Sequence, residues 1–199
     1  LNALFLPGVK LDPSIRATAD IAEAVKAGVL LLAVPAQFLR LTLRALVPHL
    51  DADTPLVICA KGIELSSGAL MSEIINTIAP NSPLAVLSGP TFAIEVARGL
   101  PAAVTLACYD TALGDRLCES LRTPKFRAYK SDDLIGAEIG GSVKNVLAIA
   151  CGIVEGRALG DNTRAALITR GLAEIVRLGL AKGARAETFR GLSGLGDLT

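Results

Sequence analysis

The apolar run Val29-Leu30-Leu31-Leu32-Ala33-Val34, closed by Pro35, decides the fold of this 199-residue sequence. Six consecutive apolar residues bounded by a helix-breaking proline predict a strand that is buried on both faces, as in the centre of a parallel sheet. A second run of the same character, Pro55-Leu56-Val57-Ile58-Cys59-Ala60, ends at Lys61-Gly62. Between the two runs, a three- and four-residue spacing of apolar residues predicts a helix that contains Phe38, Leu39, Leu43 and Leu46. Strand, helix and strand in this order are typical of a βαβ unit.

The same alternation continues to about residue 130. We expect a strand that ends at Ser88-Gly89-Pro90 and a short helix from Thr91 to near Gly99. The remaining segments expected in this part are helices over about 68–78 and 111–121 and strands over 102–107 and 125–129.

Beyond Ser131 the apolar residues keep a helical period and the strand signal ends. We expect one helix over 132–154 and a second over 162–182, with Asp161 or Asn162 as its N-cap and Gly183 as its stop. The sequence therefore predicts an α/β protein, with a partial Rossmann-type parallel sheet domain over residues 1–130 and an all-helical domain over residues 131–199.

The composition excludes several classes of protein. Twenty basic and nineteen acidic residues give a net charge of +1, which argues against a basic surface for nucleic acid or for an anionic membrane. We find no run that approaches the roughly 20 apolar residues needed to span a bilayer. The four cysteines lack the close spacing of metal-ligand pairs, so we expect buried free thiols, no metal site and a reducing cytoplasm.

Three expected strand ends carry small or polar residues, namely Val34-Pro35, Lys61-Gly62 and Ser88-Gly89-Pro90. In open parallel sheets, ligands bind at the carboxyl ends of the strands, although glycine and proline also occur there for purely geometric reasons. Lys61 is more informative, because a lysine at the end of an apolar strand must either extend into solvent or meet a negative group.

Lys144 is the only charged residue between Glu138 and Glu155. On a helix its neighbours three and four positions away are Gly140, Gly141, Leu147 and Ala148, so its ammonium group would lie on a stripe of small and apolar residues. Burial there, together with a second cation such as Lys61, would lower the pKa of this lysine and allow it to exchange a proton with an alcohol or a ketone. A structural lysine paired with a carboxylate such as Asp197 is the alternative, and this reasoning leaves both open.

Six segments resemble the bacterial NAD(P)-dependent glycerol-3-phosphate dehydrogenase family, in order and in spacing across the whole chain. They are Ala60-Lys61-Gly62-Ile63-Glu64, Leu87-Ser88-Gly89-Pro90-Thr91-Phe92-Ala93, Glu95-Val96-Ala97-Arg98-Gly99, Gly140-Gly141-Ser142-Val143-Lys144-Asn145-Val146, Arg164-Ala165-Ala166-Leu167-Ile168-Thr169-Arg170-Gly171-Leu172-Ala173-Glu174 and Gly191-Leu192-Ser193-Gly194-Leu195-Gly196-Asp197-Leu198. The resemblance implies reversible hydride transfer between NAD(P)H and dihydroxyacetone phosphate, which gives sn-glycerol 3-phosphate for glycerophospholipid synthesis. It also implies NAD or NADP as cofactor and a homodimer.

The resemblance also implies roles for individual residues. Lys144 matches the lysine that transfers a proton to the carbonyl oxygen, and Lys61 matches a lysine at the junction of substrate and cofactor. Gly89 and Thr91 match substrate contacts, and Ala93 matches a cofactor contact. Phe38 matches a residue that lines the nicotinamide side, Asn145 matches a residue that orients the substrate, and Asp197 matches a carboxylate near the substrate.

The family pattern extends beyond this sequence at both ends. A glycine-rich turn for the cofactor pyrophosphate precedes it, and a Ser-Arg-Asn segment for the substrate phosphate follows it. We therefore expect residues 1–130 to be an incomplete dinucleotide-binding domain without its first βαβ unit, residues 131–199 to be an incomplete substrate domain, and the isolated chain to have little or no activity. A related two-domain reductase for another hydroxy or keto acid, and a non-catalytic dimerising fragment, are the alternatives.

Overall fold

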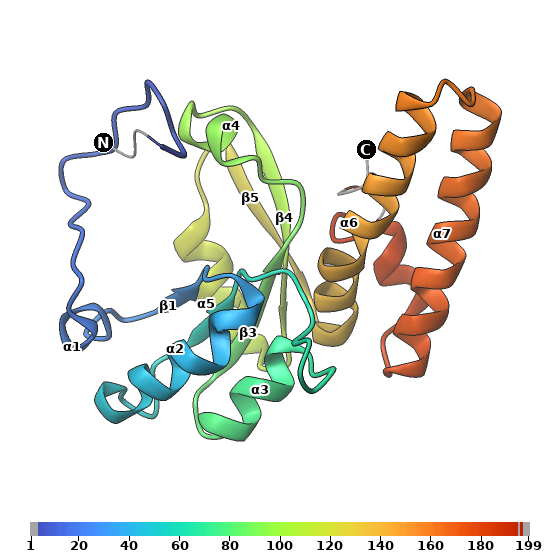
Figure 1. Ribbon diagram of the computed structural model, residues 1–199. Coiled ribbons are helices and arrows are strands. Elements are labelled where there is room, and N and C mark those ends of the chain that lie inside the picture. The colour runs from blue at the N-terminus through green and yellow to red at the C-terminus, as the bar shows by residue number, and fades with distance from the viewer. Residues whose placement is uncertain (1–3, 195, 197–199) are drawn as a thin grey trace.

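The computed structural model describes residues 4–194 and 196, which form a five-stranded sheet with helices on both faces and a helical lobe beside it (Figure 1). The strands are in the spatial order β1-β2-β3-β4-β5, and their bounds are β1 Leu30–Leu32, β2 Leu56–Ile58, β3 Leu84–Ser88, β4 Ala102–Cys108 and β5 Phe126–Ser131. We call residues 4–131 the sheet lobe and the described residues from 132 onward the helical lobe. The α/β class predicted from the sequence is confirmed.

One pairing departs from the expected parallel sheet, because β4 is antiparallel to β3. The other three pairings are parallel. The cause is the connection between these strands, whose only helix, α4 (Ala93–Ala97), has five residues. At 1.5 Å per residue it is about 7.5 Å long, whereas a five-residue strand is about 17 Å long, so this helix does not return the chain to the start of β3.

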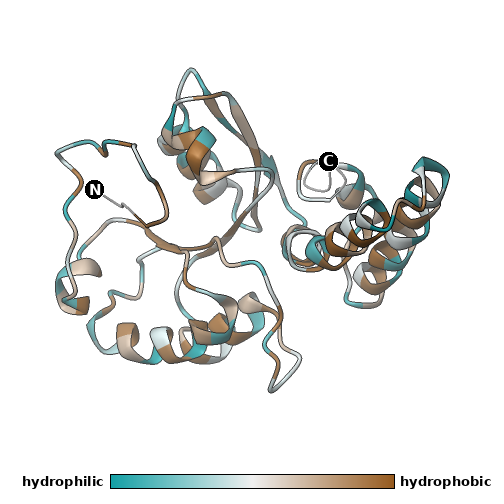
Figure 2. Cartoon of the chain, turned by 45° about the horizontal axis from the view of Figure 1, so that its top comes forward, coloured by the Kyte–Doolittle hydropathy of each residue, from teal (hydrophilic) through white to brown (hydrophobic). Residues whose placement is uncertain are grey.

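Both faces of the sheet are covered by apolar side chains that alternate along the strands. Leu56 and Ile58 pack with α2 (Leu39–Leu46) and α3 (Met71–Ile78), whereas Val57 packs on the opposite face with α5 (Thr111–Leu121). Figure 2 shows the same division, with mostly apolar strands in the middle and helices on either side. The remaining short helices of this lobe are α1 (Ile21–Ala24), η1 (Ala36–Phe38) and η2 (Val47–His49).

The helical lobe consists of α6 (Leu134–Gly156), α7 (Asp161–Ala181) and η3 (Ala186–Arg190). Asp133 caps α6 by accepting a hydrogen bond from the Gly136 amide at 2.9 Å. The N-cap predicted for α7 at Asp161 or Asn162 is wrong, because Gly160 occupies that position with a φ of +85° that favours glycine. Gly183, also at positive φ, follows the C-cap residue Lys182 and ends the helix, as the sequence predicts.

By length and composition α6 could cross a membrane, and it is the only described helix of which this is true. Some of its side chains belong to two cores inside the protein, whereas Val146, Ile149 and Ile153 are exposed. Ala137 packs with the sheet, α2 and α3, whereas Ile139 and Leu147 pack with α7 and with the buried ring of Phe189. Helix α6 is therefore the element that joins the two lobes.

Glu138 makes a polar connection between the lobes from inside this contact. The side chain belongs to α6 and is only 5% exposed. Its carboxylate accepts a hydrogen bond from the Ser72 amide at 2.9 Å and a second one from the Ser72 hydroxyl, so it satisfies a free amide in the first turn of α3. Burial raises the pKa of Glu138 from its ordinary value of 4.5 to about 7, although both hydrogen bonds oppose this shift; the nearby Glu73 adds to it.

We predict that this carboxyl makes the folded protein less stable as the pH rises. The folded protein keeps the proton of Glu138 up to about pH 7, whereas an unfolded glutamate releases it near pH 4.5. Stability is therefore full below about pH 4.5 and falls between about pH 4.5 and 7, by an amount on the order of 3 kcal/mol. Urea unfolding of the wild type and of Glu138→Gln from pH 5 to pH 8 measures this loss. The difference between the two free energies of unfolding isolates the contribution of Glu138, because all other titrating groups are common to both proteins. Parallel curves for the two proteins would contradict the prediction.

Candidate functional site

The loops that follow β1, β2 and β3 lie at one edge of the sheet, where α6 passes them. At this edge the Lys61 ammonium group donates a hydrogen bond to the Gly89 carbonyl at 3.0 Å. The loop after β2 is also held from η1, because Gln37 donates to the Ile63 carbonyl at 2.8 Å and accepts from the Leu65 amide at 3.0 Å. The structure therefore brings together two of the strand ends that the sequence predicts as a ligand edge.

Gly140 and Gly141 allow residues of both lobes to contact the backbone of α6 closely. A Cβ atom on Gly141 would stand 2.7 Å from Ser88 Oγ and 3.5 Å from Lys61 Cγ, in the sheet lobe. A Cβ atom on Gly140 would stand 2.2 Å from the Ser193 carbonyl oxygen, in the helical lobe. Neither approach is possible with a larger residue, so the glycines set the distance between the sheet loops and the segment around Ser193. We call Lys61–Gly62, Ser88–Gly89 and residues 141–144 the junction.

Lys144 belongs to the junction by its place on α6. It lies three residues after Gly141, so both residues are on the same face of the helix. Side chains on a helix lean towards its N-terminus, which directs Lys144 towards the glycine pair that contacts Lys61. The side chain is half-buried, as is that of Lys61. Lys61 is therefore at Gly141 by contact, and Lys144 is directed towards it by its place on the helix.

A buried hydroxyl lies beneath this region. Ser88 ends β3 and is 3% exposed, and its Oγ has no hydrogen-bond partner within the described part of the chain. Buried polar atoms are normally hydrogen-bonded, so an orphaned hydroxyl indicates a position where a further polar group is accommodated. Beside Lys61, this fits a site for a polar ligand.

A separate ion pair holds the loop that begins with Lys61. Arg40 on α2 donates two hydrogen bonds to the buried Glu64 carboxylate, at 2.8 and 2.7 Å. These bonds, followed by one from Ser67, lower the pKa of Glu64 from 4.5 to about 2. The same loop closes on itself through an isolated bridge between Ile63 and Leu70. Its backbone is therefore anchored on both sides of Glu64.

Gly89 is the other predicted site residue at the centre of this edge. It is buried at a φ of +150°, and a Cβ atom there would stand 3.1 Å from the Val104 backbone, so the position requires glycine. Thr91 and Ala93 follow it at exposed positions before and at the start of α4.

The remaining predicted residues are exposed or lie outside the described part of the chain. Phe38 ends η1 with its side chain 59% exposed, and Asn145 is exposed beside Lys144 on α6. Asp197 lies outside the described residues.

Sequence reasoning placed Ser88 in one of the expected strand ends but gave no individual role to it or to Ser142. The Ser142 hydroxyl accepts a hydrogen bond from the Gly62 amide at 2.9 Å. A signal for Ser142 was present, because Glu138 and Ser142 are four residues apart and so share the face of α6 that meets the sheet lobe.

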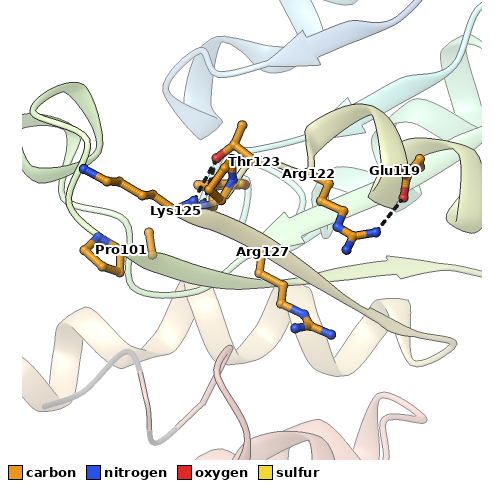
Figure 3. Close-up of a pocket in the computed structure, with 9 residues that line it drawn as sticks. Pro101, Glu119, Arg122, Thr123, Lys125 and Arg127 are labelled. Atoms are coloured by element: carbon orange, nitrogen blue, oxygen red, sulfur yellow. Dashed lines mark hydrogen bonds and ion pairs between the residues drawn. The ribbon is translucent and has the colours of Figure 1, made fainter.

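A cavity lined by basic residues lies away from the junction. It has a volume of about 570 Å³ and lies at the start of β4 and β5, where Arg122, Lys125 and Arg127 line it. In Figure 3 these three side chains point in different directions, and Arg122 is paired with Glu119 at 3.4 Å. None of the residues predicted for the site lines this cavity. Because these basic side chains do not point to one common position, the cavity is a weaker candidate for an anion-binding functional site than the junction.

Only one of the four cysteines is fully buried, which corrects the expectation that all four are. The structure shows all four as free thiols; Cys108 is buried, whereas Cys59, Cys118 and Cys151 are half-buried. Desolvation raises the pKa of Cys59 to about 11, so this thiol is not activated as a nucleophile.

Comparison with known proteins gives one consistent result. Residues 1–114 match the family model for the N-terminus of NAD-dependent glycerol-3-phosphate dehydrogenase, and residues 133–199 match the model for its C-terminus. The chain is 66% identical over 198 residues to a glycerol-3-phosphate dehydrogenase (NAD(P)+) of Paramagnetospirillum magneticum, and covers 72% of that protein. It is 63% identical over 198 residues to a protein of the same name from Rhodospirillum rubrum, 57% of which it covers; each alignment includes 99% or more of this chain.

Solved structures agree with these relatives. The glycerol-3-phosphate dehydrogenase of Coxiella burnetii superposes with a TM-score of 0.92 at 42% identity, over 97% of this chain and 59% of that chain. The yeast enzyme superposes with a TM-score of 0.88 at 30% identity, over 99% of this chain and 60% of that chain. The chain thus spans more than half, but not all, of the length of these proteins.

The glycine pair gives a prediction about stability. Gly140→Ala places a methyl group against a backbone carbonyl, which cannot move aside easily, and should lower the free energy of unfolding by about 1–3 kcal/mol. Gly152→Ala on the same helix is the matched control. No atom lies within 4 Å of its new Cβ, so the higher helix propensity of alanine should stabilise the protein by up to about 1 kcal/mol. Urea unfolding of both variants measures the two effects, and stabilisation by both would refute the close approach at Gly140.

Proposed function

The chain belongs to the NAD-dependent glycerol-3-phosphate dehydrogenase family, and from this we propose that the protein interconverts dihydroxyacetone phosphate and sn-glycerol 3-phosphate with NAD(P)H. The observation that supports the proposal most is the junction. There Lys61 of the sheet lobe lies against Gly141 and is bonded to the Gly89 carbonyl, and Lys144 follows Gly141 by three residues on α6. The product would enter glycerophospholipid synthesis.

In this proposal Lys144 is the proton donor. Reduction of a ketone adds a hydride to the carbonyl carbon and a proton to its oxygen, and the nicotinamide cofactor supplies the hydride chemistry when bound. The Lys144 ammonium group gives its proton to the carbonyl oxygen and takes one back from the alcohol in reverse. Its half-buried position limits access of water, which would otherwise compete for the proton.

Lys61 stabilises negative charge on the same oxygen. Its ammonium group is held by the Gly89 carbonyl and its loop by η1, so it is oriented before substrate arrives. A fixed positive charge that need not reorganise lowers the energy of a transition state in which negative charge develops on oxygen.

The edge formed by the loops after β1, β2 and β3 would hold the cofactor, which is NAD or NADP. The exposed ring of Phe38, the cation of Lys61 and the small exposed side chain of Ala93 fit a flat aromatic group with a carboxamide. The orphaned hydroxyl of Ser88 beneath the same edge also fits a polar ligand. In addition to Lys61 and Lys144, the substrate would contact Gly89, Thr91, Asn145 and Asp197.

The proposal extends to the domains, the location and the assembly of the protein. Residues 1–130 act as the cofactor-binding domain and residues 131–199 belong to the substrate domain. The protein works in the cytoplasm, where its free thiols stay reduced. It forms a homodimer, for which the exposed apolar side chains of Val146, Ile149 and Ile153 on α6 offer an interface.

Lys144→Ala tests the proposed reaction. We expect the rate of NADH oxidation with dihydroxyacetone phosphate to fall by about 10²–10⁴-fold, because the proton donor is lost. Lys182→Ala is the control: it also removes a lysine of the helical lobe, but from an exposed ion pair with Glu73, and should keep the wild-type rate. Both rates are measured on a protein that also carries the glycine-rich turn and the Ser-Arg-Asn segment of the family pattern. Full activity of Lys144→Ala in that protein would refute the role of Lys144, and inactivity of its wild type with this substrate would refute the proposed function.

A further inference from the structure

We propose that Ser142 is a positioning residue, whose hydroxyl ties the loop of Lys61 to α6 and so fixes Lys61 relative to Lys144. This inference rests on the proposed function only for its kinetic consequence. The tie itself rests on the contacts of Ser142, Gly62 and Glu138.

The hydroxyl of Ser142 uses both its donor and its acceptor capacity. It accepts a hydrogen bond from the Gly62 amide at 2.9 Å and lies 2.6 Å from the Glu138 carbonyl, to which it donates. The Gly62 carbonyl is a second, longer acceptor at 3.2 Å. Because a serine hydroxyl has one hydrogen, the two carbonyls share it. Ser142 therefore faces both polar backbone groups of Gly62.

Gly62 is held from its other side by steric contact. A Cβ atom on Gly62 would stand 2.6 Å from Ala36 Cβ, so η1 lies directly against this residue. Gly62 thus lies between η1 and Ser142. Lys61 is its neighbour in the chain, and any shift of Gly62 is passed on to the lysine.

Helix α6 is a rigid reference for this loop. Glu138 fixes it to α3 through Ser72, and Ser142 and Lys144 follow one and one and a half turns later. Because Ser142 and Lys144 belong to the same helix, movement of Gly62 relative to Ser142 is also movement of Lys61 relative to Lys144. A displacement of about 1 Å in an active site lowers rates by up to about 100-fold.

Removal of the hydroxyl has a specific expected effect. Ser142→Ala leaves the Gly62 amide without its partner and frees the loop, so kcat should fall by about 10- to 100-fold. The KM for dihydroxyacetone phosphate should change less than threefold, because the residues that bind the rest of the substrate are unchanged. Ser142→Thr keeps a hydroxyl at the same position and should recover at least half of the wild-type kcat.

Ser120→Ala is a matched control. The Ser120 hydroxyl on α5 donates to the carbonyl four residues before it, Arg116, at 2.8 Å, which is the same local bond that Ser142 makes to Glu138. In the hydrogen bonds of the described residues, Ser120 ties no loop to its helix. Its removal should leave kcat unchanged.

The experiment measures kcat and KM for the four proteins, and amide hydrogen exchange of the segment around Gly62. We expect faster exchange at Gly62 in Ser142→Ala and wild-type exchange in Ser120→Ala. Unchanged kcat in Ser142→Ala, or equal losses in Ser142→Ala and Ser120→Ala, would overturn the proposal. The kinetics are measured on a protein that also carries the two family segments expected beyond this chain. If that wild type is inactive, the proposed function fails, and hydrogen exchange alone decides about the tie: faster exchange in Ser142→Ala supports it, and unchanged exchange overturns it.

Discussion

Helix α6 can approach the ends of β2 and β3 because residue 141 has no side chain, and the rest of the structure depends on this contact. The space that a Cβ atom would need is taken by Ser88 Oγ, and the stem of Lys61 lies in van der Waals contact with the same position. At Gly140 the same helix is approached by backbone from the helical lobe. Two consecutive glycines in a helix cost about 1 kcal/mol each relative to alanine. The fold accepts this cost where the two lobes contact each other.

Polar contacts along one face of α6 make the approach specific. Glu138 reaches the first turn of α3, and Ser142, four residues later on the same face, reaches the loop after β2. Apolar packing alone would allow the helix to slide or rotate, because the hydrophobic effect has no preferred direction. Hydrogen bonds to backbone groups do have a direction, and they set the rotation of α6 about its own axis, which also sets the direction in which the Lys144 side chain leaves the helix.

The sequence predicts the class of fold and most elements, because buried strands and amphipathic helices leave periodic patterns. It identifies Lys61 and Lys144 because charge in an apolar setting is conspicuous. It does not predict the antiparallel β4, since the direction of a strand depends on the length of its connection and not on its own residues. Nor does it predict the roles of Ser88 and Ser142, because a serine has no periodic signature and gains a role only from neighbours distant in the chain. The cap at Gly160 was missed for a related reason: aspartate and asparagine are the commoner caps, and only the backbone angle reveals the glycine.

The central claim is that Lys61 and Lys144, one from each lobe, act on the same oxygen of the substrate. A double-mutant cycle on kcat tests this most directly, with Lys61→Ala, Lys144→Ala and the double variant. Groups that act together on one oxygen are strongly non-additive, so we expect the double variant to lose far less than the product of the two single losses. A loss in the double variant equal to that product would show that the two lysines act independently, and would contradict the account.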